Sequence, residues 1–214
     1  MRELHIFTGH YGSGKTEVSV NFAAKLRREG KKVTIIDLDT VNPYFRTNDL
    51  RKRLEDMGIE VIAGRFASTN VDMPLVPAEI SKAFNSDGCF IFDVGGDDEG
   101  AYALGRYTSE FEKNGYEMHL VVNTRRPLTS TAEEICAMAA DIEKASRLKI
   151  TDIYNNTNLS YETDKSTVMS GIGELKRAEE LTGLKIARHC GTAEAVSEIP
   201  SETAFEMEIY LKLL

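Results

Sequence analysis

Residues 9–16 combine glycines, a lysine and a hydroxyl residue at a spacing that suits the binding of a phosphate chain. The segment reads Gly9-His10-Tyr11-Gly12-Ser13-Gly14-Lys15-Thr16, between a short apolar run and a helical pattern, and it fits G-x-x-x-x-G-K-T. Glycines let backbone N–H groups approach phosphate oxygens, and the next helix adds the positive end of its dipole. The segment therefore predicts a phosphate-binding loop (P-loop).

Two side chains of this loop have separate expected tasks. Lys15 can reach the β- and γ-phosphates, and the Thr16 hydroxyl can ligate Mg²⁺. The other residues that we expect to hold the nucleotide here are Gly9, His10, Gly12, Ser13, Gly14 and Glu17. An ordinary glycine-rich turn is the alternative, but the flanking strand and helix favour the phosphate site.

Two aspartates stand two residues apart after the next apolar run. Asp37 ends the run that starts at Val33, and Asp39 follows it. Carboxylates at this spacing leave a strand on the same side, and ligands bind at the carboxyl ends of strands in open α/β sheets. Asp39 can therefore approach the γ-phosphate, the metal or the attacking water. A pair of solvated loop aspartates is the alternative.

A third acidic strand end reads Cys89-Phe90-Ile91-Phe92-Asp93-Val94-Gly95-Gly96. Four apolar residues before an aspartate are typical of the Walker B strand, whose carboxylate holds Mg²⁺, usually through water. Gly95 and Gly96 permit a close approach of the backbone to a γ-phosphate. We therefore expect Asp93 at the metal and Gly96 at the nucleotide, with an ordinary Asp-Gly-Gly turn as the alternative.

Two later strand ends carry asparagines, at Asn123 and at Asn155-Asn156. An amide presents both a donor and an acceptor, as the recognition of a base edge requires. The guanine-selecting pattern N-K-x-D follows neither strand. Asn155 or Asn156 can thus contact a base, although asparagines are also frequent in turns that bind nothing.

Strand and helix patterns alternate along the whole chain. We expect strands at 4–8, 33–37, 59–63, 89–93, 118–123, 150–154 and 184–188, and helices near 16–29, 46–57, 75–84, 100–114, 129–147, 170–182 and 202–213. Short buried strands separated by helices predict a mostly parallel sheet covered on both faces. With no linker or repeat in view, residues 1–214 are interpreted as one domain of a three-layer α/β fold.

Composition argues against several classes of function. The chain is 42% hydrophobic and 28% charged, as soluble globular proteins are. Its net charge of −8 and lack of a long basic run give no strong signal for nucleic acid. No apolar run spans a bilayer, and a strand at the start leaves no room for a signal peptide. Three scattered cysteines fit a reducing compartment, so we expect a cytoplasmic protein.

These motifs resemble the MinD/ParA branch of P-loop NTPases, a group that also includes cobyrinate and dethiobiotin synthetase-like domains. The likeness is close from Gly9 to Phe45: the P-loop, Asn21-Phe22-Ala23-Ala24, Gly30, Asp37-x-Asp39 and Asn42-Pro43. It resumes at Asp93-x-Gly95-Gly96. About a third of the chain carries the specific resemblance, and the remainder matches in the order of its elements.

The resemblance implies a P-loop NTPase fold and an ATPase that uses ATP and Mg²⁺. In it, Lys15 and Thr16 serve the phosphates and the metal, Asp39 positions or polarises the water, and Asp93 is the carboxylate at the metal. It also implies that Asn155 reads adenine.

One position departs from the resembled group. In the MinD/ParA group a second lysine follows the first glycine and reaches across a nucleotide-sandwich dimer, and in this sequence His10 stands at that position. A neutral histidine is a weaker phosphate ligand, so a nucleotide-dependent homodimer is in question and hydrolysis is expected to be slow without a partner. Arg46, Arg106, Arg125 or Arg126 can supply the missing charge, although a solvated arginine is the default.

Two functions follow from this sequence. The first is an ATPase switch that acts on an unidentified partner. The second is a small-molecule synthetase or kinase that uses the same P-loop on a metabolite. A GTPase or metal-insertion chaperone is a weaker third candidate. The acidic stretch 202–213 is interpreted as a core-packing helix, since an anionic lipid surface would repel it.

Overall fold

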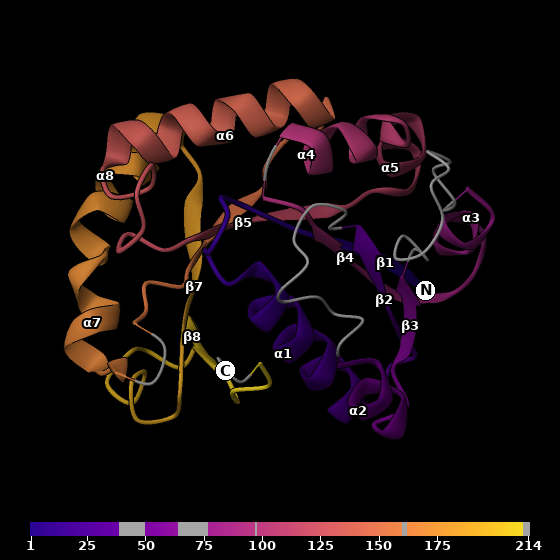
Figure 1. Cartoon of the computed structure of the whole chain (residues 1–214), viewed down its shortest axis with the longest axis horizontal. Coiled ribbons are helices and arrows are strands. Elements are labelled where there is room, and N and C mark those ends of the chain that lie inside the picture. The colour runs from indigo at the N-terminus through magenta and orange to yellow at the C-terminus, as the bar shows by residue number, and fades with distance from the viewer. Residues whose placement is uncertain (39–49, 64–76, 97, 160–161, 212–214) are drawn as a thin grey trace, which may run out of the picture.

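The centre of the molecule is a parallel β-sheet, and helices cover both of its faces (Figure 1). The computed structural model describes residues 1–38, 50–63, 77–96, 98–159 and 162–211. Within these residues the sheet has eight strands in the order β3-β2-β4-β1-β5-β6-β7-β8, and every neighbouring pair is parallel. The three-layer α/β fold expected from the sequence is therefore confirmed.

The strands are β1 (Arg2–Thr8), β2 (Val33–Leu38), β3 (Glu60–Ala63), β4 (Gly88–Val94), β5 (Glu117–Val122), β6 (Asp152–Asn155), β7 (Lys185–Gly191) and β8 (Ala204–Glu206). The helices are α1 (Lys15–Arg28), α2 (Arg51–Asp56), α3 (Pro77–Asn85), α4 (Asp98–Gly105), α5 (Thr108–Asn114), α6 (Ala132–Ser146), α7 (Lys165–Ser170) and α8 (Ile172–Thr182). In the part of the chain that the structure describes, no helix is both long and apolar enough to cross a membrane.

Alternation along the central strand β1 divides the core into two layers. Leu4 and Ile6 pack into the layer beneath α3–α6 and α8, whereas Phe7 packs into the layer beneath α1 and α2. Successive side chains of a strand point to opposite faces, so His5 shares the α1 face with Phe7, and its ring contacts Phe22 of α1. Figure 1 shows α1 and α2 on one side of the sheet and α4–α6 on the other.

The prediction of a helix at 202–213 is wrong. Ala204–Glu206 form strand β8, and no described residue of 207–211 is helical. Phe205 is buried, and its ring contacts Phe22 and Tyr154. Residues 205–209 alternate strictly between apolar and acidic types. That period of two is the pattern of a strand, and pairing of β8 with β7 stabilises it.

Other element boundaries also differ from the expectation. The helix expected at 100–114 is two helices, α4 and α5, and the Thr108 hydroxyl at the break donates to the Gly105 carbonyl at 3.1 Å. The short helix α7 was not expected. Its first turn is capped by the Asp164 carboxylate, which accepts from Thr167 N–H at 2.7 Å. In the region expected as helix 46–57, α2 begins at Arg51, and residues 39–49 lie outside the described part of the chain.

Candidate functional site

The P-loop connects the carboxyl end of β1 to the first residue of α1, as the sequence predicted. Two of its glycines combine a positive φ with a neighbouring atom that lies too close for a Cβ. Gly9 has φ +144° and a Cβ there would lie 2.3 Å from the Val121 carbonyl oxygen. Gly14 has φ +83° and a Cβ there would lie 2.3 Å from Asn156 Nδ2. The loop is thus held tightly between β5 and the residues that follow β6.

The N-terminus of α1 has the features of an anion site. Gly14 is its N-cap in the left-handed conformation, and no side chain of the described residues caps the helix. The first N–H groups of a helix have no acceptor within it, and they favour a phosphate. The Ser13 hydroxyl is buried and lacks a hydrogen-bond partner among the described residues. These observations fit the phosphate groups of a nucleotide.

Lys15 and Gly96 lie against each other across the site. Lys15 Nζ donates to the His10 carbonyl at 3.1 Å, and the residue is only 7% exposed. A Cβ on Gly96 would lie 2.8 Å from Lys15 Nζ and 2.6 Å from the Tyr11 backbone nitrogen. The segment after β4 therefore touches the P-loop so closely that residue 96 has no room for a side chain, and the expected place of Gly96 at the nucleotide stays a prediction.

Buried carboxylates lie at the neighbouring strand ends. Asp37 of β2 and Asp93 of β4 are register partners, and they are 6% and 1% exposed. Thr16, in the first turn of α1, is 8% exposed. Carboxylate and hydroxyl oxygens are the ligands that Mg²⁺ prefers, so Thr16 and Asp93 suit the metal in chemical type. Asp39 lies outside the described residues, and its expected role stays a prediction.

A cavity of about 580 Å³ opens beside the P-loop, which is within the range of ligand sites. Its walls come from five parts of the chain: the P-loop and the start of α1, the residues after β5, the residues after β6, the end of β7, and the segment 207–211. Apolar side chains of Met207, Ile209 and Leu211 form one side. This wall was missed at the sequence level, because the stretch that contains it was interpreted as a core helix.

Glu17 holds that wall in place. Its carboxylate accepts the backbone N–H of Tyr210 at 2.5 Å and that of Leu211 at 3.0 Å. One turn further along α1, the Asn21 side chain donates to the Glu208 carbonyl at 2.9 Å and accepts from the Glu208 N–H at 2.8 Å. Burial raises the pKa of Glu17, while the two N–H donors oppose that rise. Glu17 thus lines the cavity and also anchors the C-terminal segment.

The asparagines after β6 are in different environments. Asn155 is fully buried and does not line the cavity; it contacts His189 Nδ1 at 3.0 Å and donates to the Val168 carbonyl at 3.2 Å. Asn156 lines the cavity and donates to the Ser13 carbonyl at 2.7 Å. Its Oδ1 is buried and has no hydrogen-bond partner within the described chain. Asn156 is therefore better placed than Asn155 to meet a ligand.

The candidates for additional positive charge are also separated. Arg126 lines the cavity, and its Nε lies 3.5 Å from the position of a Cβ on Gly12. Arg125 instead donates to the Ser170 hydroxyl at 3.1 Å on an exposed surface. His10 lines the cavity, with Nδ1 3.1 Å from the Tyr11 carbonyl oxygen. Arg46 lies outside the described residues.

Comparison with known proteins identifies the family. A family model described as the CobQ/CobB/MinD/ParA nucleotide binding domain matches residues 5–202. A search of curated proteins finds no match.

Solved structures share the fold at low identity. FtsY from Thermotoga maritima is 21% identical, with a TM-score of 0.56 over 86% of this chain and 60% of that chain. The 54 kDa signal recognition particle protein from Aeropyrum pernix, in complex with GDP, is 22% identical, with a TM-score of 0.57 over 86% of this chain and 40% of that chain. A nucleotide-binding protein from Archaeoglobus fulgidus, in complex with ADP and with cobalt found in it, is 17% identical, with a TM-score of 0.55 over 85% of this chain and 78% of that chain. The chain spans 60% or less of the length of the first two of these proteins.

Proposed function

This chain belongs to the CobQ/CobB/MinD/ParA nucleotide-binding domain family, and from that premise we propose that it is a Mg²⁺-dependent ATPase of the MinD/ParA type that acts as a nucleotide switch on a partner. The observation that carries the proposal is that the N-terminus of α1, which no described side chain caps and which suits phosphates, opens into a cavity of about 580 Å³ that is large enough for the nucleoside.

The cavity walls favour adenine over guanine. Guanine recognition commonly uses a carboxylate that accepts from the base, as the N-K-x-D motif supplies. Glu17 and Glu208 are the carboxylates among the described lining residues. Glu17 is occupied by two backbone N–H groups, and Glu208 pairs with Arg28. With both carboxylates engaged, the apolar side chains of 207–211 and the amide of Asn156 remain to meet the base.

In the proposed reaction, Lys15 and the α1 N-terminus neutralise charge that develops on the transferring phosphoryl group. Thr16 and Asp93 would hold the Mg²⁺, which would supply positive charge beside the phosphates, and Asp39 would orient the attacking water. The close contact of Gly96 with the P-loop gives the segment after β4 a direct way to sense the γ-phosphate. Hydrolysis would then change the position of that segment and be communicated to the partner.

Fold relatives have been solved with GDP and with ADP, so the fold by itself admits either purine. A competition titration separates them: fluorescent ADP is displaced from the Mg²⁺-loaded protein by ATP or by GTP. We expect ATP to displace it at lower concentration. Tighter displacement by GTP would contradict the adenine assignment but leave the phosphate site intact.

The switch is tested separately by measuring which additions raise ATP turnover. Fractions of macromolecules and of small metabolites from the source cell are added to the purified protein in parallel. A switch is accelerated by a macromolecular fraction. Acceleration by a metabolite alone, with phosphate or ADP formed in proportion to a modified product, would show a synthetase or kinase instead.

A further inference from the structure

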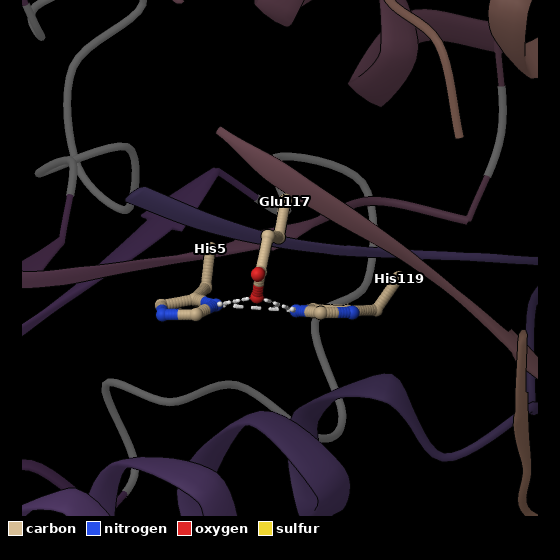
Figure 2. A group of neighbouring side chains, drawn as sticks. All are labelled: His5, Glu117 and His119. Carbon is tan, nitrogen blue, oxygen red and sulfur yellow. Dashed lines mark hydrogen bonds and ion pairs between the residues drawn. The ribbon is translucent and has the colours of Figure 1, made fainter. Parts of the chain in front are cut away.

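Two histidines and a glutamate converge away from the P-loop, on the sheet face that α1 covers. His5 lies on β1, and Glu117 and His119 lie on the neighbouring strand β5. His5 is the register partner of Glu117, and Phe7 that of His119, so the three side chains leave one face of adjoining strands. Figure 2 shows the Glu117 carboxylate reaching between the two imidazole rings. Their potential ligand atoms all lie within 4.8 Å of one another.

The separations of these atoms match those of ligands around one small cation. His5 Nδ1 lies 3.2 Å from His119 Nε2 and 3.2 Å from a Glu117 carboxylate oxygen. That same oxygen lies 3.9 Å from His119 Nε2. Tetrahedral Zn²⁺ has bonds of about 2.0–2.2 Å to nitrogen and oxygen, which puts its ligand atoms about 3.3 Å apart. Two of the three edges therefore already have nearly that length.

From this geometry we propose that His5, Glu117 and His119 form a binding site for a divalent transition-metal ion such as Zn²⁺, separate from the Mg²⁺ of the nucleotide site. Two imidazole nitrogens and one carboxylate oxygen are a ligand set that suits zinc, with water in the fourth position. Glu117 has a side chain that is 61% exposed, so an ion and its water can enter from that side. The proposal does not depend on the proposed function.

His119 is already prepared to bind a metal through Nε2. Its Nδ1 lies 2.8 Å from an Asp152 carboxylate oxygen. Since a carboxylate only accepts, this contact selects the tautomer with the proton on Nδ1 and leaves the lone pair of Nε2 facing Glu117 and His5. A carboxylate behind a metal-binding histidine orients the ring and raises its basicity.

His5 can offer Nδ1 to a metal while its other ring nitrogen carries the proton. Its Nε2 is buried and without a hydrogen-bond partner in the described structure. Ligation through Nδ1 moves the ring proton to Nε2, which faces a Glu3 carboxylate oxygen 3.8 Å away.

The surroundings suit a site whose ligands are fixed in place. The rings of Phe7, Phe22 and Tyr154 contact the His119 ring. This apolar packing restricts the imidazoles and strengthens electrostatic attraction to a cation. His5 comes four residues before Gly9 in the sequence, which corresponds to about 13 Å at the rise per residue of a β-strand. Two different ions can thus bind without sharing ligands.

The test uses the full chain, free of affinity tags, stripped of metal and without nucleotide. Zn²⁺ is titrated by calorimetry, and Co²⁺ is added as a probe whose visible absorption reports tetrahedral ligation. We expect one Zn²⁺ per chain. Glu117→Gln and His119→Gln should each weaken binding by about 100-fold or more, and Asp152→Asn by about 10–100-fold, as expected of a carboxylate behind a ligand.

His189→Gln is the matched control, because it removes another partly buried histidine outside the cluster and should leave Zn²⁺ affinity unchanged. Glu117→Gln alters an exposed side chain, and ADP binding by this variant shows that it is folded. The proposal is overturned if the parent protein binds no Zn²⁺, or if Glu117→Gln and His119→Gln bind it as the parent does.

Discussion

The Glu17 carboxylate accepts the backbone N–H of Tyr210 at 2.5 Å, which ties the C-terminal segment to the first turn of the helix that follows the P-loop. The phosphate end of the cavity and the apolar wall at 207–211 are therefore linked through one side chain. Binding of a nucleotide at the α1 N-terminus and closure of the wall over its base should consequently depend on each other.

Replacement of Glu17 by alanine tests this link. The loss of two hydrogen bonds to a carboxylate should release residues 210–211 and weaken ATP binding by about tenfold or more. Binding of inorganic triphosphate, which has no base, should change much less. Both are measured by calorimetry, with Glu29→Ala at the other end of α1 as the control. Equal losses for ATP and triphosphate would show that Glu17 acts on the phosphates rather than through the wall.

The two aspartates of the metal side should have different effects when changed to asparagine. Asp93→Asn removes a negative charge next to the expected metal, so the Mg²⁺ concentration for half-maximal turnover should rise by about tenfold. Asp39→Asn should leave that concentration nearly unchanged and slow hydrolysis sharply, because an amide accepts a proton poorly. Turnover is measured across a Mg²⁺ series. If instead Asp39→Asn raised the Mg²⁺ requirement and Asp93→Asn only slowed hydrolysis, the roles of the two residues would be exchanged.

His10 is the position at which this chain departs from the MinD/ParA pattern. If a lysine there is what a nucleotide-sandwich dimer requires, His10→Lys should shift the protein toward dimer in the presence of a non-hydrolysable ATP analogue. Sedimentation velocity measures the balance, and His10→Gln is the uncharged control. Arg126 lines the same cavity and is the alternative source of charge. An unchanged balance with analogue bound to both proteins would mean that His10 does not control dimerisation.

Stability should fall as the pH drops below about 6.5, the ordinary pKa of histidine. Burial lowers the pKa of His189, whose Nδ1 accepts from Asn155 Nδ2 at 3.0 Å. In that range the unfolded chain binds a proton that the folded chain resists, so the free energy of unfolding decreases with falling pH until the folded pKa is reached.

Urea unfolding of the metal-free protein between pH 7.5 and 5 measures this dependence. His189→Gln, which keeps an acceptor for Asn155, should show a shallower decline than the parent. Other histidines, His5 among them, contribute equally to both proteins and cancel in the comparison. Parallel curves would show that His189 does not titrate differently in the folded state.

The parts of the site that the sequence predicted are those that a short segment determines by itself. The spacing of Gly9, Gly14 and Lys15 located the P-loop, and Asp93 after four apolar residues located a buried carboxylate at the end of β4. Both depend on local backbone chemistry at the ends of parallel strands.

Features that need contacts distant in sequence were not predictable in this way. Phe205 and Met207 alternate with acidic residues, which is the pattern of a strand, but the sequence does not show that β7 is the neighbour with which β8 pairs. His5 and His119 are 114 residues apart, and their meeting depends on β1 and β5 being neighbours. Asn155 has the residue type for base recognition, but its side chain contacts His189 and Val168 instead.

The most direct test of the proposed nucleotide site is calorimetric binding of Mg-ATP combined with a phosphate-release assay on the parent protein, Lys15→Ala and the control Lys25→Ala from the same helix. We predict that the parent and Lys25→Ala bind and slowly hydrolyse ATP. In Lys15→Ala, binding should weaken and turnover should fall by about 10²–10³-fold, because the charge that develops on the phosphoryl group loses its nearest cation. Turnover by Lys15→Ala close to that of the parent would contradict the assignment of residues 9–16 as the nucleotide site.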